Sequence, residues 1–195
     1  MQNKILLSLL FLSVSSFAEA KPNYNNWKLS LNCLGPICVG MSIEQASKIT
    51  NLKPVMDENN TVIDNNGLSH TFKTYQEAIK SPNHCFHISF EHPLLKNVGF
   101  MITNKHISRI EIDGESIKTL SGIGIGDSEE KVKKTYKDKI TIEPHQYEEK
   151  GHYLIYKPKD KADQKYNLLF ETDGKKVIRF RSGYAEEVYL CEGCS

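Results

Sequence analysis

The chain has 195 residues, of which 25% are charged and 39% hydrophobic, and its formal net charge is +1 at pH 7. This near-neutral balance lacks the basic footprint of a nucleic-acid-binding protein and the polybasic segment of a membrane-surface protein, so neither class is predicted.

Residues 1–20, MQNKILLSLLFLSVSSFAEA, have the pattern of a secretory signal peptide. Lys4 supplies a short positive region, an apolar run extends from Ile5 to about Val14, and Ala20 closes a small-residue cleavage site. The apolar run is too short for a membrane span. We therefore predict a periplasmic or secreted protein, cleaved near Ala20, with about 175 residues left to build a compact domain.

An internal repeat organises the mature chain. Segments 36–50 (PICVGMSIEQASKIT) and 122–138 (GIGIGDSEEKVKKTYKD) match at a spacing of 86 residues. In each, alternating aliphatic residues lead to a glycine, Gly40 or Gly126, and a serine then opens a helix-like stretch. Ser42 and Ser128 can accept a hydrogen bond from a free backbone N–H at the helix start. Each copy therefore predicts a short extended segment, a glycine hinge and a capped helix. The GIGIG stretch lacks the Lys-Ser/Thr ending of a phosphate-binding loop, so no nucleotide cofactor is predicted.

Other elements follow from local patterns. Trp27, Leu29 and Leu31 alternate and predict an extended lead-in, whereas the Asn- and Asp-rich residues 51–69 predict a loop with one short edge strand at 61–63. Residues 72–79 predict a short helix that 81–83 would stop. The remaining strand-like runs are 85–91, 98–103, 106–112, 139–143, 152–156, 166–172 and 175–181. Asn104-Lys105 and Asp173-Gly174 predict tight hairpin turns.

The repeat extends into the strands, because residues 107–110 (ISRI) align with 177–180 (VIRF). We predict an α+β fold of two tandem units, 21–115 and 116–195, each with a short helix packed on an antiparallel β meander. The sheet face opposite the helices would be solvated, or concave and available to a partner.

All five cysteines follow the signal peptide, in the compartment where disulfides persist. Cys33 and Cys38 flank a turn-forming Leu-Gly-Pro-Ile stretch and could bridge it, and Cys85 could pin the C-terminal tail through Cys194. Cys191 would then be left over. The terminal CEGC sequence lacks the following helix that activates a thioredoxin-type thiol, so we interpret these cysteines as structural.

Residues 40–46 (GMSIEQA) resemble the Gly-Met-Thr-x-x-Gln-Val opening of the exported repeat found in β-lactamase inhibitor protein and in SmpA/OmlA-type proteins. The second copy departs from this motif at Asp127 and Lys131. The second half, from GIGIGDSEEKVKKTY through EPHQY to FETDGKKV, also looks like a family of uncharacterised exported proteins of Gram-negative bacteria. These resemblances imply the tandem helix-and-strand fold and a habit of protein binding, without a target.

Two clusters contain residue types that bind or react. Alternation would place Cys85, His87 and Glu91 on one strand face, a donor set that a metal ion accepts, but a disulfide would remove Cys85 and no metal site is predicted. His145, Tyr147 and His152 form a second cluster that could bind a polar ligand or donate a proton. No nucleophile is paired with either histidine, so no catalytic residue is predicted.

The predicted function is a non-enzymatic binding or inhibitor-like module that contacts a protein or a cell-envelope component. Its candidate binding residues are His145, Tyr147, His152, Arg109 and Arg179. Two alternatives remain open. One is a small periplasmic hydrolase or carbohydrate-binding protein that uses the region of His145, Tyr147 and His152, and the other is a periplasmic immunity protein that neutralises a toxin.

Overall fold

The structure, a computed structural model, describes residues 23–56, 61–63, 69–81, 85–191 and 194. The predicted signal peptide and the predicted helix stop at 82–83 lie outside these residues. The protein is α+β, with short helices and a large antiparallel sheet.

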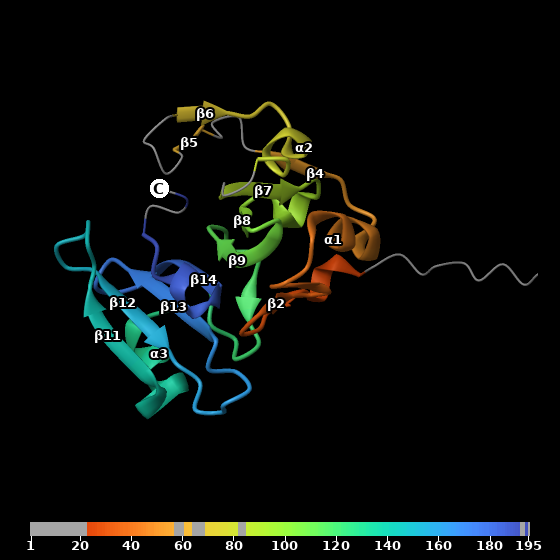
Figure 1. The fold of residues 1–195 in the computed structure, drawn as a ribbon. Helices are drawn as coiled ribbons and strands as arrows, with labels where there is room; N and C mark the ends of the chain where they lie inside the picture. The colour runs from red at the N-terminus through yellow and green to blue at the C-terminus, as the bar shows by residue number, and fades with distance from the viewer. Residues whose placement is uncertain (1–22, 57–60, 64–68, 82–84, 192–193, 195) are drawn as a thin grey trace, which may run out of the picture.

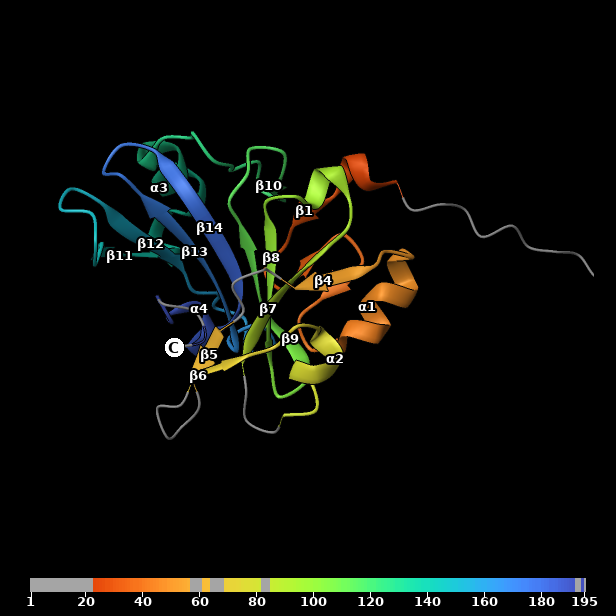
Figure 2. The same cartoon turned by 90° about the horizontal axis from the view of Figure 1, so that it is seen from above.

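An eight-stranded antiparallel sheet forms the centre of the molecule, with the strand order β11-β12-β13-β14-β9-β8-β7-β4 (Figure 1). Its strands are β4 (Pro54–Met56), β7 (Phe86–Phe90), β8 (Val98–Thr103), β9 (His106–Ile112), β11 (Ile140–Pro144), β12 (His152–Tyr156), β13 (Tyr166–Thr172) and β14 (Val177–Tyr184). The strands before and after residue 115 form two meanders, and β9 pairs with β14 to join them into one sheet. Figure 2 shows the two meanders on either side of that joint, with α1 beside one and α3 beside the other.

The other elements are short. A four-stranded sheet has the order β10-β1-β2-β3, and a separate hairpin pairs β5 with β6. The bounds of these strands are β1 (Lys28–Leu29), β2 (Cys33–Leu34), β3 (Ile37–Cys38), β5 (Thr61–Ile63), β6 (Ser69–Thr71) and β10 (Lys118–Thr119). The α-helices are α1 (Ile43–Thr50), α2 (Tyr75–Ala78), α3 (Glu129–Tyr136) and α4 (Ala185–Val188), and the 3-10 helices are η1 (Tyr24–Asn26), η2 (Pro93–Leu95) and η3 (Lys137–Lys139). None of the helices in the described part of the chain has the length and apolar character needed to cross a bilayer.

Both repeated segments form the predicted capped helices. The Ser42 hydroxyl accepts from the Gln45 N–H at 3.2 Å, and the Gln45 side chain accepts from the Ser42 N–H at 2.9 Å, a reciprocal capping box. The Ser128 hydroxyl accepts from the Lys131 N–H at 3.2 Å. Gly40 and Gly126 precede these caps with φ of 93° and 84°, a backbone conformation that side chains disfavour.

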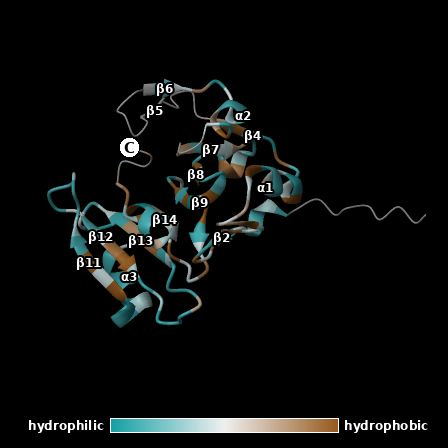
Figure 3. Cartoon of the chain, in the orientation of Figure 1, coloured by the Kyte–Doolittle hydropathy of each residue, from teal (hydrophilic) through white to brown (hydrophobic). Residues whose placement is uncertain are grey.

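The main core lies between the eight-stranded sheet and a layer that contains the small sheet, α1 and α3. Trp27, Leu29, Ile43 and Val132 in that layer are buried against alternate residues of the large sheet. The sheet residues in this core include Phe86, Ile88, Phe90, Phe100, Ile110, Ile112, Leu154, Phe170 and Phe180. In Figure 3 stretches of β12 are hydrophobic, whereas the loop between β11 and β12 is hydrophilic. The core continues from one meander to the other across the β9–β14 joint.

Both predicted disulfides are present. Cys33 and Cys38 are directly paired in the β2–β3 hairpin, and Cys85–Cys194 ties the start of β7 to the segment after α4. Of the cysteines in the described residues, Cys191 is the one outside a disulfide.

Several boundaries differ from the sequence-based expectation. The predicted strand at 61–63 is β5, but residues 51–69 contain more strand than expected, because β4 pairs with β7 at the edge of the large sheet and β6 pairs with β5. The second helix is shorter than predicted because Thr74 caps it and only residues 75–78 are helical. Although residues 129–134 are all charged except Val132, which is typical of a solvated helix face, the Glu129 side chain is only 7% exposed.

Candidate functional site

The face of the large sheet opposite the main core, here called the second face, has ion-paired residues at its centre. On β9, Arg109 and Glu111 alternate with the core residues Ile110 and Ile112 and therefore lie on the second face. Glu171 on β13 and Arg181 on β14 occupy the same face of the other meander. These four residues, called the charged row, meet where β9 pairs with β14, because Arg181 is directly opposite Glu111.

Arg109 and Glu111 form one ion pair of the charged row. The Arg109 side chain is 2% exposed, and burial together with the nearby charge of Arg181 lowers its pKa despite the opposing charge of Glu111. Burial raises the pKa of Glu111, but a hydrogen bond from His87 and the charge of Arg109 outweigh it and lower that pKa to about 2. Glu111 is therefore ionised at physiological pH.

Arg181 and Glu171 form the second ion pair, with 2.5 Å between Arg181 Nη1 and Glu171 Oε1. Both arginines also hold the C-terminal segment. Arg109 Nη1 donates to the carbonyls of Glu187 at 2.5 Å and Leu190 at 2.8 Å, and Arg181 Nε donates to the carbonyl of Val188 at 2.7 Å. A cation at the C-terminal end of a helix satisfies carbonyls that the helix leaves unpaired. The charged row thus anchors α4 on the second face.

A groove of about 480 Å³ lies beside the charged row on β7, β8 and β9. Its lining includes His87, Glu111 and Asp113, with Lys96 and Gly99 also contributing. At Gly99 an added Cβ would lie 3.6 Å from the Glu111 carboxylate, so the absence of a side chain there helps to keep the groove open. This groove is the accessible part of the second face that we consider as a binding site.

The ion pair of Arg179 with Asp113 lies at the edge of this groove. The side chains are 47% and 42% exposed, respectively. Partial burial lowers the pKa of Arg179, but the charge and hydrogen bond of Asp113 raise it overall. Of the predicted binding residues, Arg179 is therefore exposed enough to contact a partner. Arg109 is buried, and its contacts are with Glu111 and the C-terminal segment.

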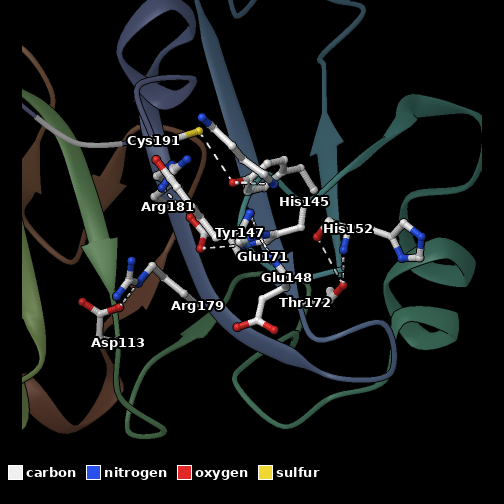
Figure 4. A network of polar contacts seen from close by, with 12 residues as sticks. Asp113, His145, Tyr147, Glu148, His152, Glu171, Thr172, Arg179, Arg181 and Cys191 are labelled. Carbon is white, nitrogen blue, oxygen red and sulfur yellow. Dashed lines mark hydrogen bonds and ion pairs between the residues drawn. The ribbon is translucent and has the colours of Figure 1, made fainter. Parts of the chain in front are cut away.

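His145 and His152 do not converge on a common ligand, as Figure 4 shows. The His145 ring is 6% exposed, stacks on Tyr153 at 4.4 Å and has Nε2 3.5 Å from Glu171, on the second face. Its Nδ1 accepts the N–H groups of Tyr147 and Glu148, which fixes the turn. The His145 ring is therefore part of the packed second face and is not open to a ligand.

His152 lies on the opposite face of β12. Its Nδ1 is 2.8 Å from Glu129 in α3, and the Thr172 hydroxyl donates to the same carboxylate. Burial raises the pKa of Glu129, but the hydrogen bonds from Thr172 and His152 lower it overall. The contacts of Glu129 with His152 and Thr172 thus join α3 to the sheet. Tyr147, the third member of the predicted cluster, has a side chain on the surface that is 60% exposed.

The considered metal ligands are also separated. Cys85 is in a disulfide, Glu91 pairs with Lys53 at 3.3 Å, and His87 contacts Glu111 at 3.5 Å. Among the residues that the structure describes, no three histidine, cysteine or acidic side chains are grouped so as to hold a metal ion.

Sequence reasoning did not single out Glu111, Asp113, Glu171 or Arg181. The alternation of charged and aliphatic residues in 109–113 (RIEID) predicts that Arg109, Glu111 and Asp113 share a strand face. It does not predict that β14 lies next to β9, which is what brings Arg181 to Glu111.

No protein-family model matches the chain, and no curated protein matches it. A solved structure, described as the uncharacterized protein yfeY from Escherichia coli, is similar with a TM-score of 0.44 and 14% sequence identity, over 80% of this chain and 99% of that chain. A likeness at this level carries no argument about function, so the functional case depends on the chain's own residues.

Proposed function

We propose that the protein is a non-enzymatic binding module that acts outside the cytoplasm and holds a protein or cell-envelope component in the groove on the second face. The observation that carries this proposal is the groove itself, which is bordered by charged groups held in place by ion pairs. Replacing a buried ion pair by apolar residues is often neutral or stabilising, so stability alone is a weak reason for such a row. Fixed charges around an open groove favour specific recognition of a complementary surface.

The two disulfides and the signal-peptide pattern support a location outside the cytoplasm. In an oxidising compartment, the Cys85–Cys194 disulfide would keep the C-terminal segment on the second face, which leaves the groove as the accessible surface beside it.

We also propose that the chain consists of two tandem units, 21–115 and 116–195. Equivalent backbone bonds join each repeated segment to its meander, since the Gly40 N–H donates to the Ile107 carbonyl and the Gly126 N–H to the Val177 carbonyl, both at 2.8 Å. A bulge interrupts β8–β9 at Met101 and β13–β14 at Glu171, and these two positions are 70 apart, as are Ile107 and Val177. An arrangement of two units joined side by side accounts for a second face that spans both.

A matched pair of charge swaps tests the groove. Residues 21–195, tagged, serve as bait for exported and envelope proteins, and the double variant Asp113→Lys/Arg179→Glu reverses the ion pair at the groove edge. The control, Asp138→Lys/Lys159→Glu, reverses another exposed pair, whose side chains are 71% and 65% exposed. Exposed pairs contribute about 0–1 kcal/mol, so both variants should fold.

We expect a stoichiometric partner that the wild type and the control retain and the groove variant loses. A partner retained equally by all three proteins would contradict the groove as the binding site, and the absence of any specific partner would contradict the binding function. The identity of the captured partner separates an inhibitor from an immunity protein.

A further inference from the structure

One sulfur of the Cys85–Cys194 disulfide lies against a histidine. Cys194 Sγ is 3.7 Å from His87 Nδ1, and Cys85 is two positions before His87 on the same side of the strand. In the Cys33–Cys38 hairpin, by contrast, Cys38 Sγ lies 4.0 Å from the Pro36 backbone oxygen. The contact with an imidazole therefore distinguishes Cys194.

The imidazole is itself backed by charges. His87 Nε2 is 3.5 Å from Glu111 Oε1, and Glu111 is ion-paired with the buried Arg109. Glu111 is ionised and accepts a hydrogen bond from His87, so it orients the ring, in the way that an acidic residue supports a catalytic histidine. The result is a line of sulfur, imidazole, carboxylate and guanidinium groups on the second face.

We propose that the Cys85–Cys194 disulfide is a thiol–disulfide exchange site in which Cys194 is the leaving sulfur and an exported dithiol is the partner. A thiolate of the partner attacks Cys85 Sγ and forms a mixed disulfide, while the bond between Cys85 and Cys194 breaks. The electron pair remains on Cys194 as a thiolate beside the His87 imidazolium, whose extra proton comes from solvent.

The second thiol of the partner, as its thiolate, then attacks the partner's sulfur in the mixed disulfide. Cys85 leaves as a thiolate and takes a proton, so the partner dithiol is oxidised to a disulfide and the protein's disulfide is reduced to a Cys85 thiol and a Cys194 thiolate. A leaving thiol that is stabilised as thiolate departs faster and makes the disulfide more oxidising. His87 is the positioning residue that supplies this stabilisation.

The site is accessible to such a partner. The His87 side chain is 29% exposed, both cysteines are half-buried, and His87 and Glu111 line the groove on the second face. A chain segment that occupies the groove would therefore lie beside His87, which contacts Cys194. The remaining cysteine, Cys191, is 3.6 Å from the Tyr153 hydroxyl and outside both disulfides.

A first experiment measures the reactivity of Cys194. In the variant Cys85→Ser/Cys191→Ser, with the Cys33–Cys38 disulfide intact, the rate of alkylation by iodoacetamide is followed by mass spectrometry from pH 4 to 10. For an ordinary thiol, the alkylation rate reaches half of its maximum at about pH 8.5, where half of the thiol is ionised. We expect about pH 7.5 or lower, a return toward the ordinary midpoint in His87→Gln, and no change in the control His106→Gln. A midpoint above about pH 7.5, or one that His87→Gln does not move, would overturn the proposal.

A second experiment follows the reduction of the native disulfide itself. Cys191→Ser protein, with and without His87→Gln, is equilibrated with reduced and oxidised glutathione, and the thiols are trapped and counted. At pH 8, we expect His87→Gln to make Cys85–Cys194 harder to reduce by about threefold or more in the equilibrium constant, with Cys33–Cys38 unchanged as an internal control. No shift at that pH, or one in the other direction, would overturn the role of His87.

Discussion

Glu129 and Glu130 are adjacent in the sequence, yet their carboxylates have different surroundings. Glu130 is 83% exposed, whereas Glu129 is 7% exposed and accepts hydrogen bonds from Thr172, His152 and Lys133. We expect Glu129→Ala to lower the free energy of unfolding by about 1–3 kcal/mol, because it leaves the buried Thr172 hydroxyl without this acceptor. Glu130→Ala should change it by less than about 0.5 kcal/mol. Urea unfolding of both variants measures the difference, and equal losses would contradict the role of Glu129.

The depressed pKa of Glu111 predicts a dependence of stability on pH. The pKa of Glu111 is about 2 in the folded protein, below the value of 4.5 for an unperturbed glutamate. The ionised carboxylate therefore stabilises the fold fully above about pH 4.5, and this contribution is lost as the pH falls toward 2. The contribution is on the order of 3 kcal/mol. Urea unfolding between pH 2 and 6 should therefore show a shallower profile for Glu111→Gln than for the wild type. The control Glu115→Gln, at an exposed position, should keep the wild-type slope, and parallel profiles for all three proteins would contradict the assignment.

At the scale of the elements, the central strands were predictable from the sequence. The expected ranges 98–103, 106–112, 152–156 and 166–172 are those of β8, β9, β12 and β13, because aliphatic and aromatic residues are concentrated there in short runs that bury one or both strand faces. The parallel pairing of β1 with β10 was not predictable, since it joins Lys28 to Lys118 across the chain. The same reason applies to the candidate site, where the contacts of Arg181 with the C-terminal segment and of His87 with Cys194 depend on tertiary structure.

The glycine before each capped helix carries a prediction that belongs to this scale. Gly126 has φ of 84°, and no atom lies within 4 Å of where its Cβ would be, so its requirement is conformational and not one of close packing. We expect Gly126→Val to destabilise the fold by about 1–3 kcal/mol and Gly126→Asn to cost less, because asparagine tolerates positive φ. Thermal unfolding measures both, with Gly99→Ala as the control at a glycine without positive φ.

If the two segments are equivalent, Gly40→Val, at φ of 93°, should destabilise the fold by a similar amount. A Gly126→Val protein with unchanged stability would contradict the conformational argument. A large difference between the two valine variants would weigh against the tandem units.

At the scale of the whole molecule, the β9–β14 joint and the shared core predict cooperative unfolding. Trp27, the single tryptophan, lies in the first half, so its fluorescence follows that half, whereas far-ultraviolet circular dichroism follows both meanders. We expect the two signals to change at the same urea concentration, as in a two-state transition. Separate midpoints would mean that each meander unfolds independently, despite their common sheet.

The Cys85–Cys194 link also has a consequence for the order of events during biogenesis. The two cysteines are 109 positions apart, so Cys85 must wait as a thiol for roughly 5–20 s of synthesis before its partner exists. During that interval Cys33 and Cys38 have already been synthesised, and either of them could form a disulfide with Cys85. Their separation of only 5 positions lets them close into a hairpin first. The early local bridge would thereby protect the late one from mispairing, and a chain without Cys38 should accumulate a misfolded Cys33–Cys85 species during export.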